Sequence, residues 1–427
     1  MKSRSLQFSG YERMYLLGYY NLIFDALICV FLFLAFSQFS GHTNRYLLMI
    51  AIVIILKKII LNETVTITKN FILFCIFCLS YILVFTYNFG YSRTIAFQWV
   101  AGMPLIYLLS DEIRFYGNGQ QKFKYLFIMM FGLFMHGFLN LVSFNPSIGR
   151  NPIDIWSGNI MAATLQNTLF TLAAAIFSVY LFFSKNKILK VCSAIILTIC
   201  IVNGFLTSTR TGLFIIAILL LINLIIKIIR TKNKKSFKKL VTILISIFGV
   251  CCLLLLILML CNVSLGSVLP LIDRYIKNPG YMFKIDPRFE IWLTSFVNIF
   301  KFPFGGFAFK DAVGAYAHNL WLDIFINAGW LAGILYLVIT GLNIATLVKV
   351  FKSKKIGSFD KLLILSIMVA LYINSAVEAI LDGNILVLYV LTYMQAFAKK
   401  LVNENKTKGD TYESFMAVQY LCSQPRK

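Results

Sequence analysis

Long apolar stretches recur along the whole chain, separated by short polar segments. Most are close to the 20 or so apolar residues that a helix needs to cross a bilayer. They are rich in Leu, Ile and Phe and lack the alternation of a barrel strand, so helices are predicted. We expect an all-α polytopic membrane protein with about 12 transmembrane helices. The stretches are 14–37, 44–61, 71–88, 94–110, 124–144, 158–183, 188–206, 211–230, 240–262, 322–350, 361–382 and 384–401.

Basic residues are distributed unevenly over the loops between these stretches. Most of the 40 Lys and Arg residues lie at the two chain ends and in one alternating set of loops. Because cytoplasmic loops concentrate Lys and Arg, we expect a bacterial inner-membrane protein with both termini in the cytoplasm. Four short external loops each carry one arginine: Arg45, Arg93, Arg150 and Arg210.

Composition agrees with this picture and excludes other classes. Hydrophobic residues make up 59% of the chain and charged residues 13%, whereas soluble proteins carry roughly 25% charged residues. The net charge of +23 is divided among short loops and forms no single basic face, so nucleic acid is not expected as a partner. Lys57 and Lys58 lie near the end of the second stretch, where we expect them to snorkel toward the headgroups.

The chain divides into four parts on this basis. Residues 1–262 hold transmembrane helices 1–9, residues 263–318 form a periplasmic segment, residues 319–401 hold helices 10–12, and residues 402–427 are a polar cytoplasmic tail. Asp286-Pro287 predicts a helix start inside the periplasmic segment. An amphipathic helix at the membrane surface is then expected, with one apolar face of Phe289, Trp292, Leu293, Phe296 and Phe300. The tenth stretch is long and is expected to turn inward near Gly329.

Three residues on the external side are candidates for chemistry. Arg210 lies in the segment Ser208-Thr209-Arg210-Thr211-Gly212, at the start of a helix whose backbone N–H groups favour an anion. Arg288 lies in the first turn of the amphipathic helix, and His318 at the end of the periplasmic segment has an imidazole that titrates near neutral pH. Simpler roles are a snorkelling side chain for Arg210, a surface ion pair with Glu290 or Asp286 for Arg288, and packing for His318.

Other ionisable residues carry weaker signals. His42 and His136 are expected to be structural. Asp25, Glu378 and Asp382 lie in or near apolar stretches, where charges are functional candidates by default. Glu378 or Asp382 is expected to pair with an external arginine.

The order of these motifs resembles the family of O-antigen ligases and polymerases, bacterial membrane glycosyltransferases of the GT-C type. The resemblance covers about residues 206–335, and Gly149-Arg150-Asn151-Pro152 adds a weaker match. It rests on Ser-Thr-Arg-Thr-Gly at a helix start, Asp286-Pro287-Arg288-Phe289-Glu290-Ile291-Trp292, Pro303-Phe304-Gly305-Gly306, and His318-Asn319 followed by Gly329.

The resemblance implies a metal-independent, inverting glycosyl transfer at the periplasmic face, with no cofactor. The donor is a glycan on undecaprenyl pyrophosphate. Arg210 and Arg288 would hold the pyrophosphate, and His318 would position or deprotonate the attacking sugar hydroxyl. Arg150, Asn319 and Glu290 would bind substrate. Membrane lipid and the acceptor glycan are expected partners, and a chain-length regulator protein is a further candidate.

Several functions fit this pattern. We favour a polymerase of lipid-linked repeat units, because the periplasmic segment is modest in length. A ligase that transfers the glycan to the lipid A core is the first alternative. A transporter or flippase of lipid-linked glycan is the second, although no internal repeat indicates one. A non-catalytic scaffold for glycan assembly is the third.

Overall fold

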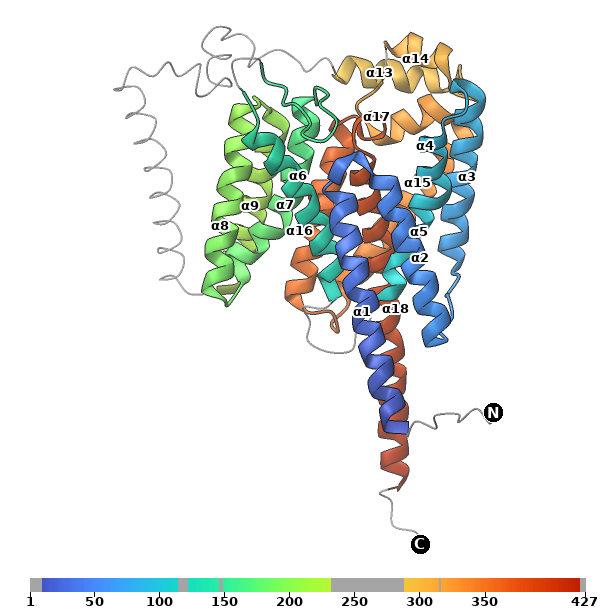
Figure 1. The fold of residues 1–427 in the computed structure, drawn as a ribbon, viewed down its shortest axis with the longest axis vertical. Coiled ribbons are helices and arrows are strands. Elements are labelled where there is room, and N and C mark those ends of the chain that lie inside the picture. The colour runs from blue at the N-terminus through green and yellow to red at the C-terminus, as the bar shows by residue number, and fades with distance from the viewer. Residues whose placement is uncertain (1–9, 114–121, 146–148, 232–287, 315, 423–427) are drawn as a thin grey trace, which may run out of the picture.

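The computed structural model describes residues 10–113, 122–145, 149–231, 288–314 and 316–422, although for 10–18 and 405–422 only the helical backbone is described. Within these ranges the fold is all-helical (Figure 1), and the only β-type pairing is an isolated antiparallel bridge between Ile153 and Ile160. The all-α prediction is therefore confirmed for the part of the chain that is described.

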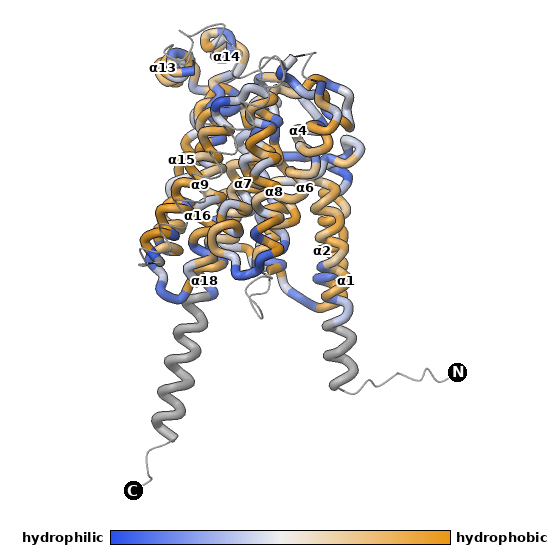
Figure 2. Tube along the Cα trace, turned by 90° about the vertical axis from the view of Figure 1, so that its left-hand side faces the viewer, coloured by the Kyte–Doolittle hydropathy of each residue, from blue (hydrophilic) through white to orange (hydrophobic). Residues whose placement is uncertain are grey.

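Nine of the described helices are long and apolar enough to cross a membrane, which gives the chain the architecture of a multi-pass membrane protein. Hydrophobic residues follow these helices, and hydrophilic residues gather at the turns (Figure 2). The nine are α1 (Gly10–Phe36), α3 (Lys69–Phe89), α6 (Lys124–Val142), α7 (Ala163–Phe183), α8 (Lys187–Leu206), α9 (Arg210–Thr231), α15 (Leu320–Lys352), α16 (Ser358–Val377) and α18 (Ile385–Cys422). Helix α18 continues through most of the predicted tail.

Three of the expected spans have a different outcome. The stretch 44–61 forms a helix, α2 (Thr43–Leu61), but it carries Arg45, Lys57 and Lys58 and is not among the nine. The stretch 94–110 is helical throughout, as α4 (Arg93–Phe97), a π-helical turn (Gln98–Gly102) and α5 (Met103–Leu109), and it is not among the nine. The stretch 240–262 and residues 263–287 and 315 of the predicted periplasmic segment lie outside the described residues.

The expectation that Lys57 snorkels is wrong. Its side chain is only 1% exposed and lies 3.2 Å from Asp25 Oδ1 and 2.7 Å from Glu112 Oε2. Asp25 also pairs with Lys124 and accepts a hydrogen bond from the Tyr125 hydroxyl (2.8 Å). These pairs join α1, α2, α6 and the turn at Ser110–Glu112. A buried ammonium is tolerated there because two carboxylates compensate its charge.

Helix α15 breaks at Gly329, where the turn was predicted, and that the helix turns inward from the membrane surface there stays a prediction. Gly329 has φ 68° and ψ −163°, and helical geometry resumes after it. The turn around Gly305 packs directly on this break: Trp330 N–H donates to Pro303 O (2.8 Å) and Gly306 N–H donates to Ile326 O (2.7 Å). A Cβ atom at Gly329 would overlap the Pro303 carbonyl, so both the positive φ and the close backbone approach require glycine.

One end of the bundle carries the short helices α13 (Arg288–Ile299), α14 (Phe307–Val313) and α17 (Ile380–Gly383), as seen at the top of Figure 1. We call it the α13 end. The helices alternate in direction, so α7, α9, α15 and α18 all begin at this end. Residues far apart in the sequence, at the starts of these helices, are thereby brought to one surface.

Candidate functional site

A cavity of about 610 Å³ opens at the α13 end and is lined by Arg150, Arg210, Arg288 and His318. We call it the arginine cavity. Four separate segments of the chain therefore bring the three predicted arginines and the predicted histidine to one place. Its volume is typical of small-molecule sites. The rest of the lining consists of the hydroxyl side chains of Thr164, Ser208, Thr209 and Thr211 and the apolar side chains of Phe214, Phe289, Ile291, Trp292, Ile373 and Val377.

Arg210 is placed by the tight turn between α8 and α9. Ser208 has φ 51° within this turn, and Thr207 Oγ1 donates to Asn203 O (2.6 Å), which closes it onto α8. A Cβ atom at Gly212 would overlap the side-chain amide of Asn167, so this glycine lets α9 pack against α7. Because α9 begins at Arg210, the backbone N–H groups of its first turn also lie at this end of the cavity.

Arg150 belongs to a loop that is held by Asp154. The carboxylate of Asp154 lies 2.6 Å from Nε2 of the fully buried His136, and it accepts the Trp156 and Ser157 N–H groups at 3.0 and 2.7 Å. Burial raises the pKa of Asp154, but the hydrogen bonds from His136 and Ser157 outweigh it, so the pKa lies well below its usual range. His136 therefore has the structural role expected for it.

Arg288 is the first residue of α13 and pairs with a buried acid. Its Nη2 lies 3.7 Å from Oε2 of Glu378, which is 4% exposed and directly follows α16. The expected pairing of Glu378 with an arginine is confirmed, and that this arginine lies on the external side stays a prediction. Asp382 instead lies 3.8 Å from a lysine, Lys310.

Helix α13 is amphipathic, and one residue of its predicted apolar face is misplaced. Phe289, Leu293, Phe296 and Phe300 are exposed together, as expected. Trp292 instead turns toward the protein, where its Nε1–H donates to Ala317 O (2.8 Å). A buried indole N–H usually needs a hydrogen-bond acceptor, and here the acceptor is the residue before His318. The bond therefore links α13 to the loop that carries His318.

The backbone on both sides of His318 is held by Asp323. Asp323 is 1% exposed, and its Oδ1 and Oδ2 accept the N–H groups of Ala317 (2.6 Å) and Asn319 (3.1 Å). His318 itself has φ 53°, a conformation that costs energy in a non-glycine residue, and its ring contacts Tyr316 edge-on at 4.7 Å. The imidazole is thus presented from a rigid strained loop.

Asn319 and Glu290, two of the predicted substrate-binding residues, are not among the residues that line the arginine cavity. Asn319 Oδ1 accepts the Leu322 N–H (3.2 Å) at the start of α15, and its Nδ2 donates to Ala376 O (3.1 Å). Its amide therefore fastens α15 to the end of α16. Glu290 is exposed on α13. That either residue contacts substrate stays a prediction.

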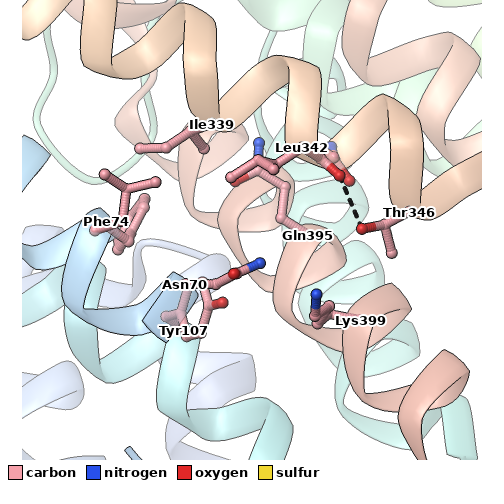
Figure 3. Close-up of a pocket in the computed structure, with 10 residues that line it drawn as sticks. Asn70, Phe74, Tyr107, Ile339, Leu342, Thr346, Gln395 and Lys399 are labelled. Atoms are coloured by element: carbon pink, nitrogen blue, oxygen red, sulfur yellow. Dashed lines mark hydrogen bonds between the residues drawn. The ribbon is translucent and has the colours of Figure 1, made fainter. Parts of the chain in front are cut away.

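A second, much smaller cavity lies within the helices α3, α5, α15 and α18 (Figure 3). It measures about 30 Å³ and is lined by polar side chains, among them Asn70, Tyr107, Gln395 and Lys399. Such a space accommodates water but no sugar. None of the predicted site residues lines it.

Within the described ranges, no group of three or more His, Cys, Asp or Glu side chains is placed to hold a metal ion.

Comparisons with known proteins add nothing to this geometry. No family model matches the chain, and no curated protein matches it.

Proposed function

We propose that this protein transfers an oligosaccharide from an undecaprenyl-pyrophosphate carrier to a sugar hydroxyl at the periplasmic face of the bacterial inner membrane. The favoured activity is polymerisation of lipid-linked repeat units of the O-antigen or capsule type. The observation that carries the proposal is the arginine cavity, in which Arg150, Arg210, Arg288 and His318 line one space.

The cationic part of the cavity suits a diphosphate. The guanidinium groups are planar forks that bind two phosphate oxygens each and stay charged at any physiological pH. Glu378 offsets one of the three charges, and the remaining two match the minimum charge of a pyrophosphate diester. The start of α9 adds backbone N–H donors. Apolar residues such as Phe214 and Ile373 provide a surface for the polyprenyl chain.

In the proposed reaction the acceptor oxygen attacks the anomeric carbon of the donor glycan. The bond from that carbon to the pyrophosphate oxygen breaks, and the electron pair leaves with the carrier. Arg210 and Arg288 stabilise the negative charge that develops on the leaving group. His318 accepts the proton of the attacking hydroxyl, and the configuration at the anomeric carbon inverts.

The test in cells uses alanine at Arg210, Arg288 and His318. Each variant is expected to abolish glycan chain elongation while the protein remains in the membrane. Arg93→Ala is a matched control, because Arg93 is an exposed arginine at a neighbouring turn and does not line the arginine cavity. Full-length glycan in all three alanine variants would contradict the proposal.

Two further measurements separate the alternatives. In a deletion strain, a single capped repeat unit on the acceptor indicates a lost polymerase, whereas polymer retained on its lipid carrier indicates a lost ligase. An assay of pure protein in detergent, supplied with lipid-linked repeat units, tests whether the protein is an enzyme or a transporter. Longer glycan formed without a sealed compartment is possible only for an enzyme.

A further inference from the structure

A second large cavity at the α13 end has a different chemical character. It measures about 380 Å³ and lies between the α1–α2 turn, α4 and the start of α18. We call it the amide cavity, after Gln38, Asn44 and Gln98. Its volume lies within the range of small-molecule sites, about 300–1,000 Å³. Its polar lining is completed by His42, Thr43, Arg45 and Thr94.

Irregular backbone from two parts of the chain meets at this cavity. Gln38 and its neighbour Ser40 both have φ 52°, a left-handed conformation that costs non-glycine residues about 1–3 kcal/mol each. Gln98 begins the π-helical turn that lies within the expected fourth span. Strained residues and π-helical turns both concentrate at functional sites, so their convergence on one cavity indicates a binding role.

The lining fits an uncharged polyol better than an anion. Amide and hydroxyl side chains both donate and accept hydrogen bonds, as sugar hydroxyls do. Arg45 is the one arginine of the amide cavity, against three in the arginine cavity.

Two links join the segments that line the two cavities. Val377 at the end of α16 lines the arginine cavity and Ile385 at the start of α18 lines the amide cavity, so their Cα atoms are at most about 28 Å apart. Trp156, on the loop that carries Arg150, donates its Nε1–H to Ser37 O (3.0 Å) and packs edge-on against Phe39 (4.9 Å). An oligosaccharide of several sugars is long enough to reach from one cavity to the other.

We propose that the amide cavity is an oligosaccharide-binding subsite, which holds the glycan several sugars away from the bond that reacts. The proposal rests on the proposed function, since it takes the glycan of the same reaction as its ligand. In this proposal the amide cavity recognises the sugars of the repeat unit, while the arginine cavity binds the pyrophosphate and the start of the polyprenyl chain.

The experiment measures direct binding to the full-length protein in detergent. The probe is the oligosaccharide released by mild acid from the lipid-linked repeat units of the same cells, which lacks the pyrophosphate. Asn44→Ala and Gln98→Ala are each expected to weaken its binding about tenfold, the effect of one well-made hydrogen bond. Asn159→Ala is the control, because Asn159 is exposed at the same end and lines neither cavity. Melting temperatures verify that each variant is folded.

Each outcome separates this inference from the proposed function. Wild-type affinity in folded Asn44→Ala and Gln98→Ala, with glycan synthesis intact in the wild type, overturns the subsite alone. Competition by inorganic phosphate at equal concentration identifies an anion site and also overturns it. Probe binding that needs Asn44 and Gln98, in a protein that forms no glycan with any acceptor, supports the subsite and contradicts the glycosyltransferase. Arg210→Ala is expected to keep probe binding and lose glycan synthesis.

Discussion

Arg288, the first residue of α13, lies 3.7 Å from Glu378, the buried carboxylate directly after α16. The pair connects a surface helix to the end of a membrane helix at the arginine cavity. Any substitution of Arg288 therefore changes two things at once, the charge of the cavity and the compensation of a buried acid.

Arg288→Ala is expected to destabilise the protein as well as inactivate it. Removing one partner of a buried ion pair costs about 3–5 kcal/mol, because the remaining carboxylate loses the attraction of the guanidinium group. Since Arg288 keeps some solvent contact, with 19% of its side chain exposed, we expect roughly 3 kcal/mol. Thermal unfolding in detergent measures the loss.

The double variant Arg288→Ala/Glu378→Gln separates stability from function. Neutralising Glu378 removes the buried charge that Arg288 offsets, so the melting temperature is expected to recover while glycan synthesis stays lost. Recovery of both would show that Arg288 acts only through Glu378 and does not hold the donor.

Arg210→Lys tests whether the guanidinium fork or only its charge is needed. Lysine keeps the charge but binds phosphate as a single point. We expect the turnover rate to fall about tenfold in Arg210→Lys and 10²- to 10³-fold in Arg210→Ala, the usual effect of losing one donor to a developing charge. Equal rates in the lysine variant and the wild type, measured on lipid-linked repeat units, would exclude bidentate binding. Arg93→Lys is the matched control.

Uninterrupted apolar stretches predicted their helices well. The stretch 71–88 became α3 (Lys69–Phe89) and the stretch 188–206 became α8 (Lys187–Leu206), because lipid requires the backbone bonds to be satisfied within each segment. Features that depend on a neighbouring helix were missed. The burial of Lys57 needs Asp25 and Glu112, and the π-helical turn ends at Gly102, which packs on Tyr389.

In the candidate site, too, the sequence predicted which residues are present but not the contacts that depend on another segment. Arg150, Arg210 and His318 could be selected because each is a polar residue in a loop that the charge pattern assigns to one side, and the alternation of helices brings these loops to one end of the bundle. The role of Asp323 could not be predicted, because the hydrogen bonds that it accepts from the Ala317 and Asn319 N–H groups depend on the exact path of the loop. The inward turn of Trp292 likewise depends on an acceptor from a different segment.

Asp323→Asn is expected to lower the turnover rate without changing donor affinity. An asparagine side chain offers one acceptor oxygen where the carboxylate offers two, so one of the backbone bonds beside His318 is lost. Displacing a catalytic group by about 1 Å costs on the order of 10²-fold in rate. Steady-state kinetics with lipid-linked repeat units separate kcat from KM. The control is Asp382→Asn, an exposed acid at the same end, which is expected to leave kcat unchanged.

Gly329→Ala and Gly341→Ala compare two glycines of α15. At Gly329 the positive φ and the Pro303 carbonyl both oppose a Cβ atom, so we expect a loss of folded protein. At Gly341 nothing lies within 4 Å of an added Cβ atom, and alanine should stabilise the helix by up to about 1 kcal/mol. Gel filtration in detergent and melting temperatures measure both. Equal yields of folded protein and equal melting temperatures for the two variants would show that folding does not require the break at Gly329.

Asp154→Asn is expected to destabilise the loop of Arg150 in a pH-dependent way. The folded state holds the pKa of Asp154 below its ordinary value of 3.8. A carboxylate whose pKa is lower in the folded state stabilises the folded protein at pH values above its unfolded-state pKa. This stabilisation is lost as the pH falls toward the pKa of the folded state. The difference in melting temperature between wild type and Asp154→Asn should therefore be constant from pH 7 to about 5 and narrow below about 4. Asp311→Asn, an exposed acid on α14, should show no such difference at any pH. A constant difference down to pH 3 would mean that the charge of Asp154 does not hold this loop.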